Sequence, residues 1–131
     1  MTGVVLPVSV AGSASGWTLV DYVTRQGRTE PASGDGAPLV FEFGQLGDGE
    51  LWLIDHAVVA CDSTTATSVR WYESAISDLA LLDGSDRGNF DVADWPAGLH
   101  VRPSQSLVVV WSGASAGARG AVTVQARVLR R

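Results

Sequence analysis

The stretch at residues 83–94, "DGSDRGNFDVAD", has the residue types of a calcium-binding loop. A twelve-residue calcium loop has oxygen ligands at its first, third, fifth, seventh, ninth and twelfth positions and glycine at its sixth. In this chain Asp83, Ser85, Asp91 and Asp94 occupy the first, third, ninth and twelfth positions, and Gly88 occupies the sixth. The question is whether these side chains hold a cation or only turn the chain.

Two residues argue against calcium. Arg87 stands at the fifth position, where its positive charge would repel a cation. Asp94 stands at the last position, and its side chain is shorter than that of the glutamate that usually binds there through both oxygens. Aspartate, asparagine and glycine are also the residues of tight turns. We therefore interpret the stretch as a structural corner between strands and expect no metal site, with calcium binding or a surface contact with a partner as alternatives.

No other group of residues has the spacing of a catalytic motif. His56 and His100 fall on different expected strands, and no nucleophile elbow accompanies them. Glycine-rich motifs for phosphate or dinucleotide binding are absent from the sequence. Cys61 is the only cysteine, so we expect no disulfide within the chain and interpret it as a buried small hydrophobic residue. We expect no catalytic residue, no cofactor and no enzymatic activity.

The charge pattern narrows the class of partner. The net charge is −5, the chain has no lysine, and its nine arginines are scattered, so we expect no binding to nucleic acid. No apolar stretch approaches the ~20 residues that span a bilayer, so we expect no membrane contact. Arg130 and Arg131 at the end of the chain are a candidate contact with an acidic partner, although a solvated tail is the favoured interpretation.

Hydrophobic periodicity predicts strands. In residues 120–131, valine and alanine alternate with polar residues at period two, which is typical of a strand with one buried face. Val69 and Trp71 alternate with Arg70 and Tyr72 in the same way.

Residues 50–61 and 106–111 are apolar on both faces, which favours central strands. Strict alternation over residues 50–61 predicts two faces, one with Leu51, Leu53, Asp55, Ala57 and Val59 and the other with Trp52, Ile54, His56 and Val58.

Shorter strand candidates lie at residues 4–10, 17–23, 38–43, 79–82 and 99–102, and turn residues such as "DGSDRGN" and "WPAG" separate the strands. No segment shows a helical stripe. The sequence therefore predicts an all-β fold, an antiparallel β-sandwich of eight or nine short strands. We expect one domain overall, with an N-terminal strand or arm and loop at residues 1–37 and the sandwich core at residues 38–131.

Five tryptophans in a short chain need an explanation. Trp52, Trp71 and Trp111 alternate with core-like residues, so we expect them inside the sandwich. Trp95 precedes Pro96 and is the best candidate for an exposed anchor at an interface or on a ligand.

A longer pattern goes beyond generic β structure. The segments "GELWLIDHAVVACDSTTATSVRWYES", "LLDGSDRGNFDVADWPAGLHV" and "SQSLVVVWSGASAGARGAVTV", followed by "QARVLR", lie within residues 49–130. Together they resemble small β-sandwich virion proteins of tailed phages that infect actinobacteria. The resemblance rests on a "W-x-I/V" strand, a "G-N-x-D-V-A-D" crossover and a "V-V-W-x-G-A-S-x-G-A" hairpin. Residues 1–48 have no counterpart.

The resemblance implies a jelly-roll-like sandwich with a structural role in the virion. It implies capsid decoration, a head fibre base or a minor tail component, with the major capsid protein or a tail protein as partner. It also implies a homo-oligomer, with a trimer as the favoured number. Residues 1–16 would then be an arm that adds a strand to a neighbour's open edge. A minor tail protein and a carbohydrate-binding module for host recognition remain alternatives.

Overall fold

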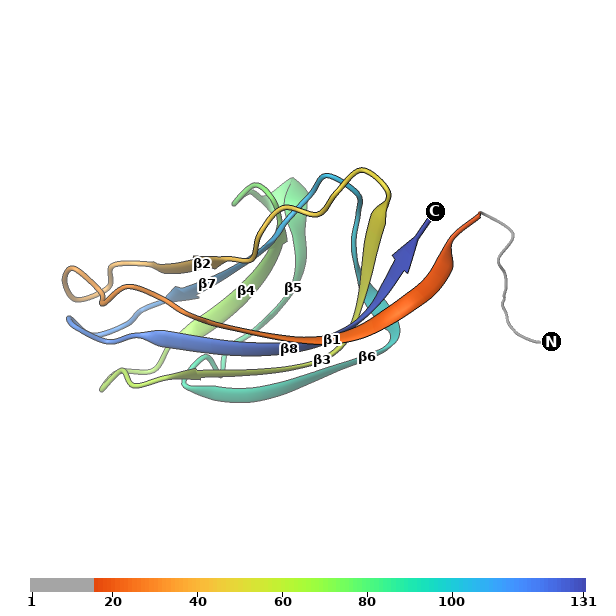
Figure 1. Cartoon of the computed structure of the whole chain (residues 1–131). Coiled ribbons are helices and arrows are strands. Elements are labelled where there is room, and N and C mark those ends of the chain that lie inside the picture. Colours follow the sequence, from red (N-terminus) through yellow and green to blue (C-terminus); the bar gives the residue numbers. More distant parts are fainter. Residues whose placement is uncertain (1–15) are drawn as a thin grey trace.

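The computed structural model describes residues 16–131, which form two four-stranded antiparallel sheets packed face to face (Figure 1). The first sheet has the order β1-β8-β3-β6, and the second has the order β2-β7-β4-β5. The elements are β1 (Thr18–Arg28), β2 (Leu39–Glu42), β3 (Glu50–Cys61), β4 (Ser68–Glu73), the 3-10 helix η1 (Asp78–Ala80), β5 (Leu81–Ser85), β6 (Phe90–Val101), β7 (Leu107–Ser112) and β8 (Gly120–Arg130). The predicted all-β antiparallel sandwich is confirmed.

The strand pairing is that of a jelly roll. β1 pairs with β8, β2 with β7, β3 with β6 and β4 with β5, as in one long hairpin that has been rolled up. The predicted jelly-roll-like topology is therefore confirmed. The strand candidate at residues 4–10 and most of the expected arm at residues 1–16 lie outside the described residues.

Part of the segment expected to be an N-terminal strand or arm and loop, residues 1–37, belongs to the first sheet. Thr18–Arg28 is a strand of the first sheet and pairs with β8 from Thr18 to Arg28. Strand structure also extends beyond the candidate at residues 17–23 and continues through Gln26 and Gly27. Neighbouring backbone overrides the weak strand propensity of these residues.

The period-two prediction holds for β8 and β4. In β8, alternate residues are buried, namely Val122, Val124, Ala126 and Val128. In β4, Val69 and Trp71 are buried, whereas Arg70 and Tyr72 are half-buried. β7 is buried from Leu107 to Trp111 and lies between β2 and β4, as its apolar sequence predicts for a central strand.

The predicted faces of β3 are wrong beyond its midpoint. β3 is central, as predicted, but its pairing register with both neighbours shifts between Ile54 and His56, so Asp55 is an extra, bulged residue. A bulge reverses which alternate residues face inward. The buried residues are consequently Trp52 and Ile54 before the bulge and Ala57, Val59 and Cys61 after it.

The "WPAG" segment is not a turn between strands but an irregularity inside β6. Ile54 pairs with Leu99 and His56 pairs with Asp94, so four residues of β6 stand opposite the single Asp55. Gly98 has a φ of 85°, and a Cβ there would lie 2.8 Å from Cβ of Leu53. Glycine therefore allows the strand to bend closely over β3.

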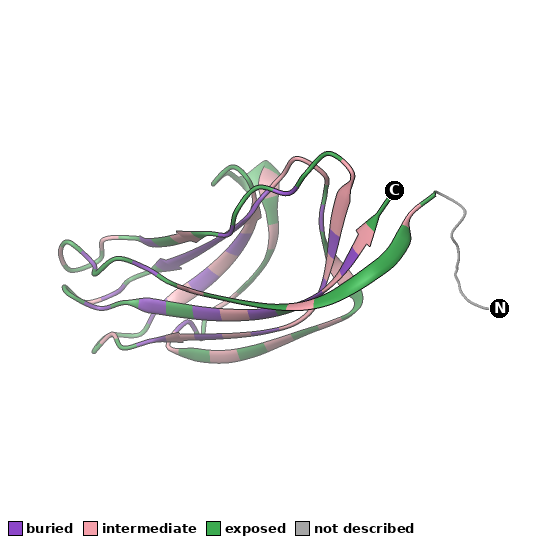
Figure 2. Cartoon of the chain, in the orientation of Figure 1, coloured by how far each residue is buried: buried purple, intermediate pink, exposed green. Residues whose placement is uncertain are grey.

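The hydrophobic core lies between the two sheets (Figure 2). Trp52, Trp71 and Trp111 are buried there, as predicted. Cys61 is also buried, as predicted, and desolvation raises the pKa of its thiol. Across residues 16–131, no helix has the length and apolar character needed to cross a membrane.

Candidate functional site

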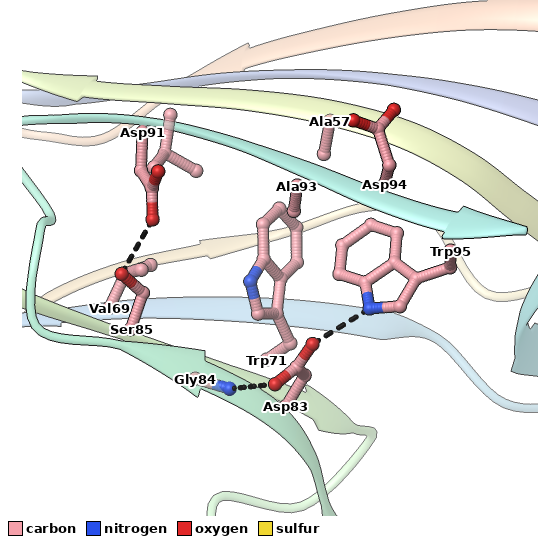
Figure 3. A pocket seen from close by; sticks show the side chains of 11 residues that line it. Ala57, Val69, Trp71, Asp83, Gly84, Ser85, Asp91, Ala93, Asp94 and Trp95 are labelled. Carbon is pink, nitrogen blue, oxygen red and sulfur yellow. Dashed lines mark hydrogen bonds between the residues drawn. The ribbon is translucent and has the colours of Figure 1, made fainter.

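A cleft of about 330 Å³ opens where β5 and β6, the edge strands of the two sheets, face each other (Figure 3). Asp83 and Ser85 project into it from β5, and Asp91, Ala93 and Trp95 project from β6. The inward positions of these edge strands are therefore largely polar. Inward-pointing charged residues are one way in which natural sheets protect exposed edges from pairing with other chains.

Tryptophan rings form the apolar part of the cleft. The rings of Trp71 and Trp95 are 5.4 Å apart between centroids and lie edge to face at 87°. The indole Nε1 of Trp95 donates a hydrogen bond of 2.7 Å to Oδ2 of Asp83 (Figure 3). Trp95 is half-buried, so it is less exposed than the anchor that the sequence predicts; its role at an interface stays a prediction.

The carboxylates of the cleft also bond to neighbouring protein groups. Oδ1 of Asp83 accepts the backbone N–H of Gly84 at 2.7 Å. The Ser85 hydroxyl donates to Oδ2 of Asp91 at 2.6 Å, and this bond lowers the pKa of Asp91, helped by the backbone N–H of Val92. Hydrogen bonds thus stabilise the Asp91 anion and hold the carboxylate of Asp83 in place.

The corner between β5 and β6 is fixed to the loop before β4. The backbone N–H of Gly88 donates to the carbonyl of Thr67, and the carbonyl of Gly88 accepts Nε1 of Trp111 at 3.1 Å. The Asn89 side chain also donates to the carbonyl of Thr65 at 3.0 Å. A Cβ at Gly88 would lie 2.4 Å from Oγ1 of Thr67, so glycine is needed for close approach. A turn between strands does lie within the predicted stretch, but it is confined to residues 86–89, because Asp83 and Ser85 belong to β5 and Asp91 and Asp94 belong to β6.

The residues of the calcium-like pattern point in different directions. Asp83 and Asp91 point into the cleft, whereas Asp94 borders the cleft but points its side chain away from it and bonds to His56 (Figure 3). Within residues 16–131, no three histidine, cysteine, aspartate or glutamate side chains gather closely enough to hold a metal ion.

The two histidines lie apart from the serine of the cleft. Nδ1 of His56 is 2.6 Å from Oδ1 of Asp94, and the side chain of His56 is 33% exposed. His100 is exposed farther along β6. In the described part of the chain, no hydrogen bond joins either histidine to a serine, and Ser85 bonds to an aspartate instead. The arrangement found here is a hydrogen-bonded, partly apolar cleft and contains no assembled Ser–His–Asp set.

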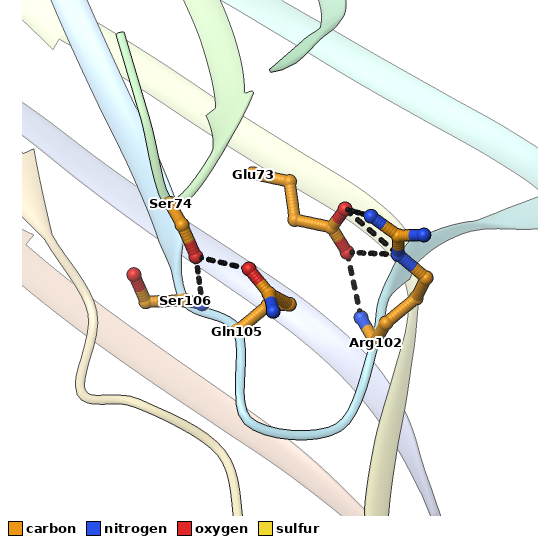
Figure 4. Close-up of polar contacts among 5 residues, drawn as sticks. All are labelled: Glu73, Ser74, Arg102, Gln105 and Ser106. Carbon is orange, nitrogen blue, oxygen red and sulfur yellow. Dashed lines mark hydrogen bonds and ion pairs between the residues drawn. The ribbon is translucent and has the colours of Figure 1, made fainter.

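A second polar cluster lies where the end of β4 meets the β6–β7 connection (Figure 4). The Arg102 guanidinium contacts Glu73 at 2.7 Å, and the Arg102 backbone N–H donates to Oε2 of Glu73 at 2.8 Å. Burial alone would raise the pKa of Glu73, but the hydrogen bonds and charge of Arg102 lower it. Ser74, with a φ of 64°, bonds to Gln105 and Ser106. This cluster holds strand connections in place.

The terminal arginines form contacts within their own chain. Arg130 is 3.3 Å from the carboxylate of Glu50, and the guanidinium of Arg131 lies 4.7 Å from the ring centroid of Trp17. Both arginines are exposed. Their predicted contact with a partner is untested.

Comparison with known proteins gives structural similarity only. No protein-family model matches the sequence, and no curated protein matches it. The capsid structure of the Helicobacter pylori bacteriophage KHP30 contains a chain that is similar with a TM-score of 0.57 and 10% identity, over 85% of this chain and 90% of that chain. This similarity shows a shared fold.

Two further structures are more distant. A chain in the virus-like particle of the extra small virus of the giant freshwater prawn Macrobrachium rosenbergii is similar with a TM-score of 0.39 and 9% identity, over 95% of this chain and 89% of that chain. The C-terminal CBM6 of LamC from Zobellia galactanivorans is similar with a TM-score of 0.38 and 10% identity, over 82% of this chain and 100% of that chain. Scores this low carry no argument about function.

Proposed function

We propose that this chain is a non-enzymatic structural protein of a phage particle, a decoration protein that binds the outer surface of the head as a homo-oligomer. One observation carries the proposal: the eight-stranded jelly roll is shared with a phage capsid chain over 85% of this chain. Because a fold does not determine a function, the site and surface must also fit.

The surface fits contact with other proteins. Large apolar side chains are exposed on the outer face of the first sheet, including Phe90 at 61% and Val92 at 45%. These two residues pair with Ala60 and Val58 of β3 and so share one face with them. Exposed apolar groups on a small protein support a binding surface. Trp95, Arg130 and Arg131 remain proposed contact residues, with the major capsid protein or a tail protein as partner.

Binding to particles tests the proposal. Particles of the virus that encodes this sequence would be produced without the gene and mixed with the purified protein. We expect the protein to sediment with these particles to a fixed ratio, and a gold-labelled antibody to mark the head. Label on the tail would instead support a minor tail protein. Absence of binding to particles that otherwise assemble normally would refute the structural role.

The cleft between β5 and β6 favours one other candidate, a carbohydrate-binding module. It combines the Trp95 ring with the hydrogen-bond acceptors Asp83 and Asp91, which suits a sugar. Against this, sugar stacking needs exposed rings, and Trp71 is 2% exposed. Oligosaccharides that protect tryptophan fluorescence from a soluble quencher would favour the module. Unchanged quenching would count against it.

A further inference from the structure

β1 is exposed along its whole length, unlike the strand beside it. None of its 11 residues is buried, whereas alternate residues of its neighbour β8 are buried (Figure 2). Leu19 is 45% exposed and Tyr22 is 71% exposed. A long, exposed edge strand is a site where another strand can pair.

The second sheet covers only one end of β1. Its nearest edge strand, β2, has four residues, and its Phe41 ring packs beneath Gly27, where a Cβ would lie 2.2 Å from that ring. The inward face farther along β1 carries Asp21, Val23 and Arg25, since these residues pair with the inward-facing Val128, Ala126 and Val124. Neither Asp21 nor Arg25 forms an ion pair within residues 16–131.

The outer edge of β1 has backbone groups that β8 does not use. The N–H of Tyr22 donates to the side chain of Asp21, and the carbonyl of Thr24 accepts Nη1 of Arg25. In an antiparallel strand, groups that do not bond to one neighbour point to the opposite edge. From Tyr22 onward, after the register shift between Leu19 and Asp21, the even-numbered residues therefore present their N–H and C=O groups to the free edge.

We propose that a second copy of this chain occupies this edge, with the two β1 strands antiparallel about a two-fold axis at Val23. This register places Asp21 opposite Arg25 of the second copy, and Arg25 opposite Asp21 of the second copy. Two oppositely charged cross-strand pairs form on one face. On the other face, Tyr22 lies opposite Thr24 of the second copy. The two copies join their first sheets into one continuous sheet.

Hydrogen bonding and charge both select this register. The edge groups of the two copies can bond only if even-numbered residues of one copy lie opposite even-numbered residues of the other. The two-fold axis must therefore pass through a residue position and cannot lie between two residues. An axis at Tyr22 would place Asp21 opposite Val23, and an axis at Thr24 would place Asp21 opposite Gly27. Only the axis at Val23 satisfies both charges, and opposite charges across strands are favourable.

The symmetry determines the number of copies. The same edge serves both partners, so the contact closes at two copies and gives a dimer. A trimer, the number favoured by the sequence resemblance, would need two different edges in contact. The dimer and the trimer are therefore distinguishable by mass.

A charge exchange tests the pairing. Light scattering across a concentration series would compare the wild-type chain with D21R, R25D and the double variant. We expect the wild type to be a dimer, and each single variant to weaken self-association by about tenfold or more, because each places like charges opposite each other twice. The double variant should recover the dimer. An equimolar mixture of D21R and R25D should form a heterodimer, since every facing pair is then Arg–Asp.

A second variant tests the backbone contact. Thr24→Pro removes an N–H at the free edge while leaving the bonds to β8, so it should yield a folded monomer. Circular dichroism would check the fold. A wild-type monomer, including one whose edge is occupied by its own residues 1–15, would overturn the pairing. A trimer would also overturn it, and so would an oligomer whose mass is the same for the wild type and the charge-exchanged variants. The pairing is measured in solution, so its failure is separate from failure to bind particles.

Discussion

Nε1 of Trp95 lies 2.7 Å from Oδ2 of Asp83, and this hydrogen bond joins the edge strand of the first sheet to the edge strand of the second. The bond from Ser85 to Asp91 connects the same two strands. Together they hold the open side of the sandwich, where the inward residues are polar and the apolar core ends.

Replacing Asp83 by alanine should lower the free energy of unfolding by about 1 kcal/mol, because a half-buried indole donor loses its partner. Urea unfolding followed by circular dichroism measures the change. Asp86→Ala is the matched control, since Asp86 is an exposed aspartate of the same corner. Its effect should stay within about 0.5 kcal/mol. Equal effects of the two substitutions would contradict a bracing role for Asp83.

Gly98→Ala should destabilise the protein through backbone strain and a steric clash together. Its φ of 85° disfavours a side chain, and its Cβ would lie 2.8 Å from Cβ of Leu53. We expect a loss of about 2–3 kcal/mol in the free energy of unfolding. Gly117→Ala has a similar φ of 81° but no atom within 4 Å, so it should cost only the strain, about 1 kcal/mol. If both variants lost the same stability, the close packing of β6 on β3 would be disproved.

Stability should fall in acid partly through Glu73. Arg102 holds the pKa of Glu73 below its ordinary value of 4.5, so the stabilisation is present above that value and is lost as pH falls through the lowered pKa. Glu73→Gln should cost about 1–2 kcal/mol at neutral pH and reduce the loss of stability below pH 4.5. Unfolding curves across this pH range measure the effect. Glu30→Gln, at an exposed glutamate, is the control and should change the free energy of unfolding at neutral pH by less than about 0.5 kcal/mol.

Cys61 should react slowly with thiol reagents in the folded protein. Burial raises the pKa of its thiol, and the thiolate is the reactive form. Alkylation in denaturant should therefore be faster by at least about tenfold than alkylation of the native protein near neutral pH. Comparable rates would indicate that the end of β3 opens readily in solution.

The sequence predicts the strands well where alternation is uninterrupted. β8 keeps period two from Val122 to Val128, and its buried residues are the predicted ones. β3 changes phase at Asp55, and its sequence shows no sign of the change because both faces are mostly apolar. The bulge depends on pairing with β6 and β8, which no local pattern reveals.

The sequence does not reveal the cleft, for a different reason. The stretch at residues 83–94 predicts one corner, yet Asp83 and Ser85 belong to β5 while Asp91 belongs to β6. Their spacing at period two was a usable signal: Asp91, Ala93 and Trp95 alternate, as do Asp83 and Ser85. The inward positions of these two strands hold polar residues, because an edge strand need not bury apolar side chains. The alternation of apolar and polar residues that indicates a strand is therefore weak here.

Mass spectrometry of purified virus particles tests the structural role most directly. Under the proposed function a phage encodes this sequence, so particles of that phage would be banded in a density gradient and each protein would be quantified relative to the major capsid protein. We predict that this chain bands with the particles at a constant ratio to the capsid protein across the peak. Its presence in the infected-cell lysate together with its absence from the banded particles would contradict the proposed function.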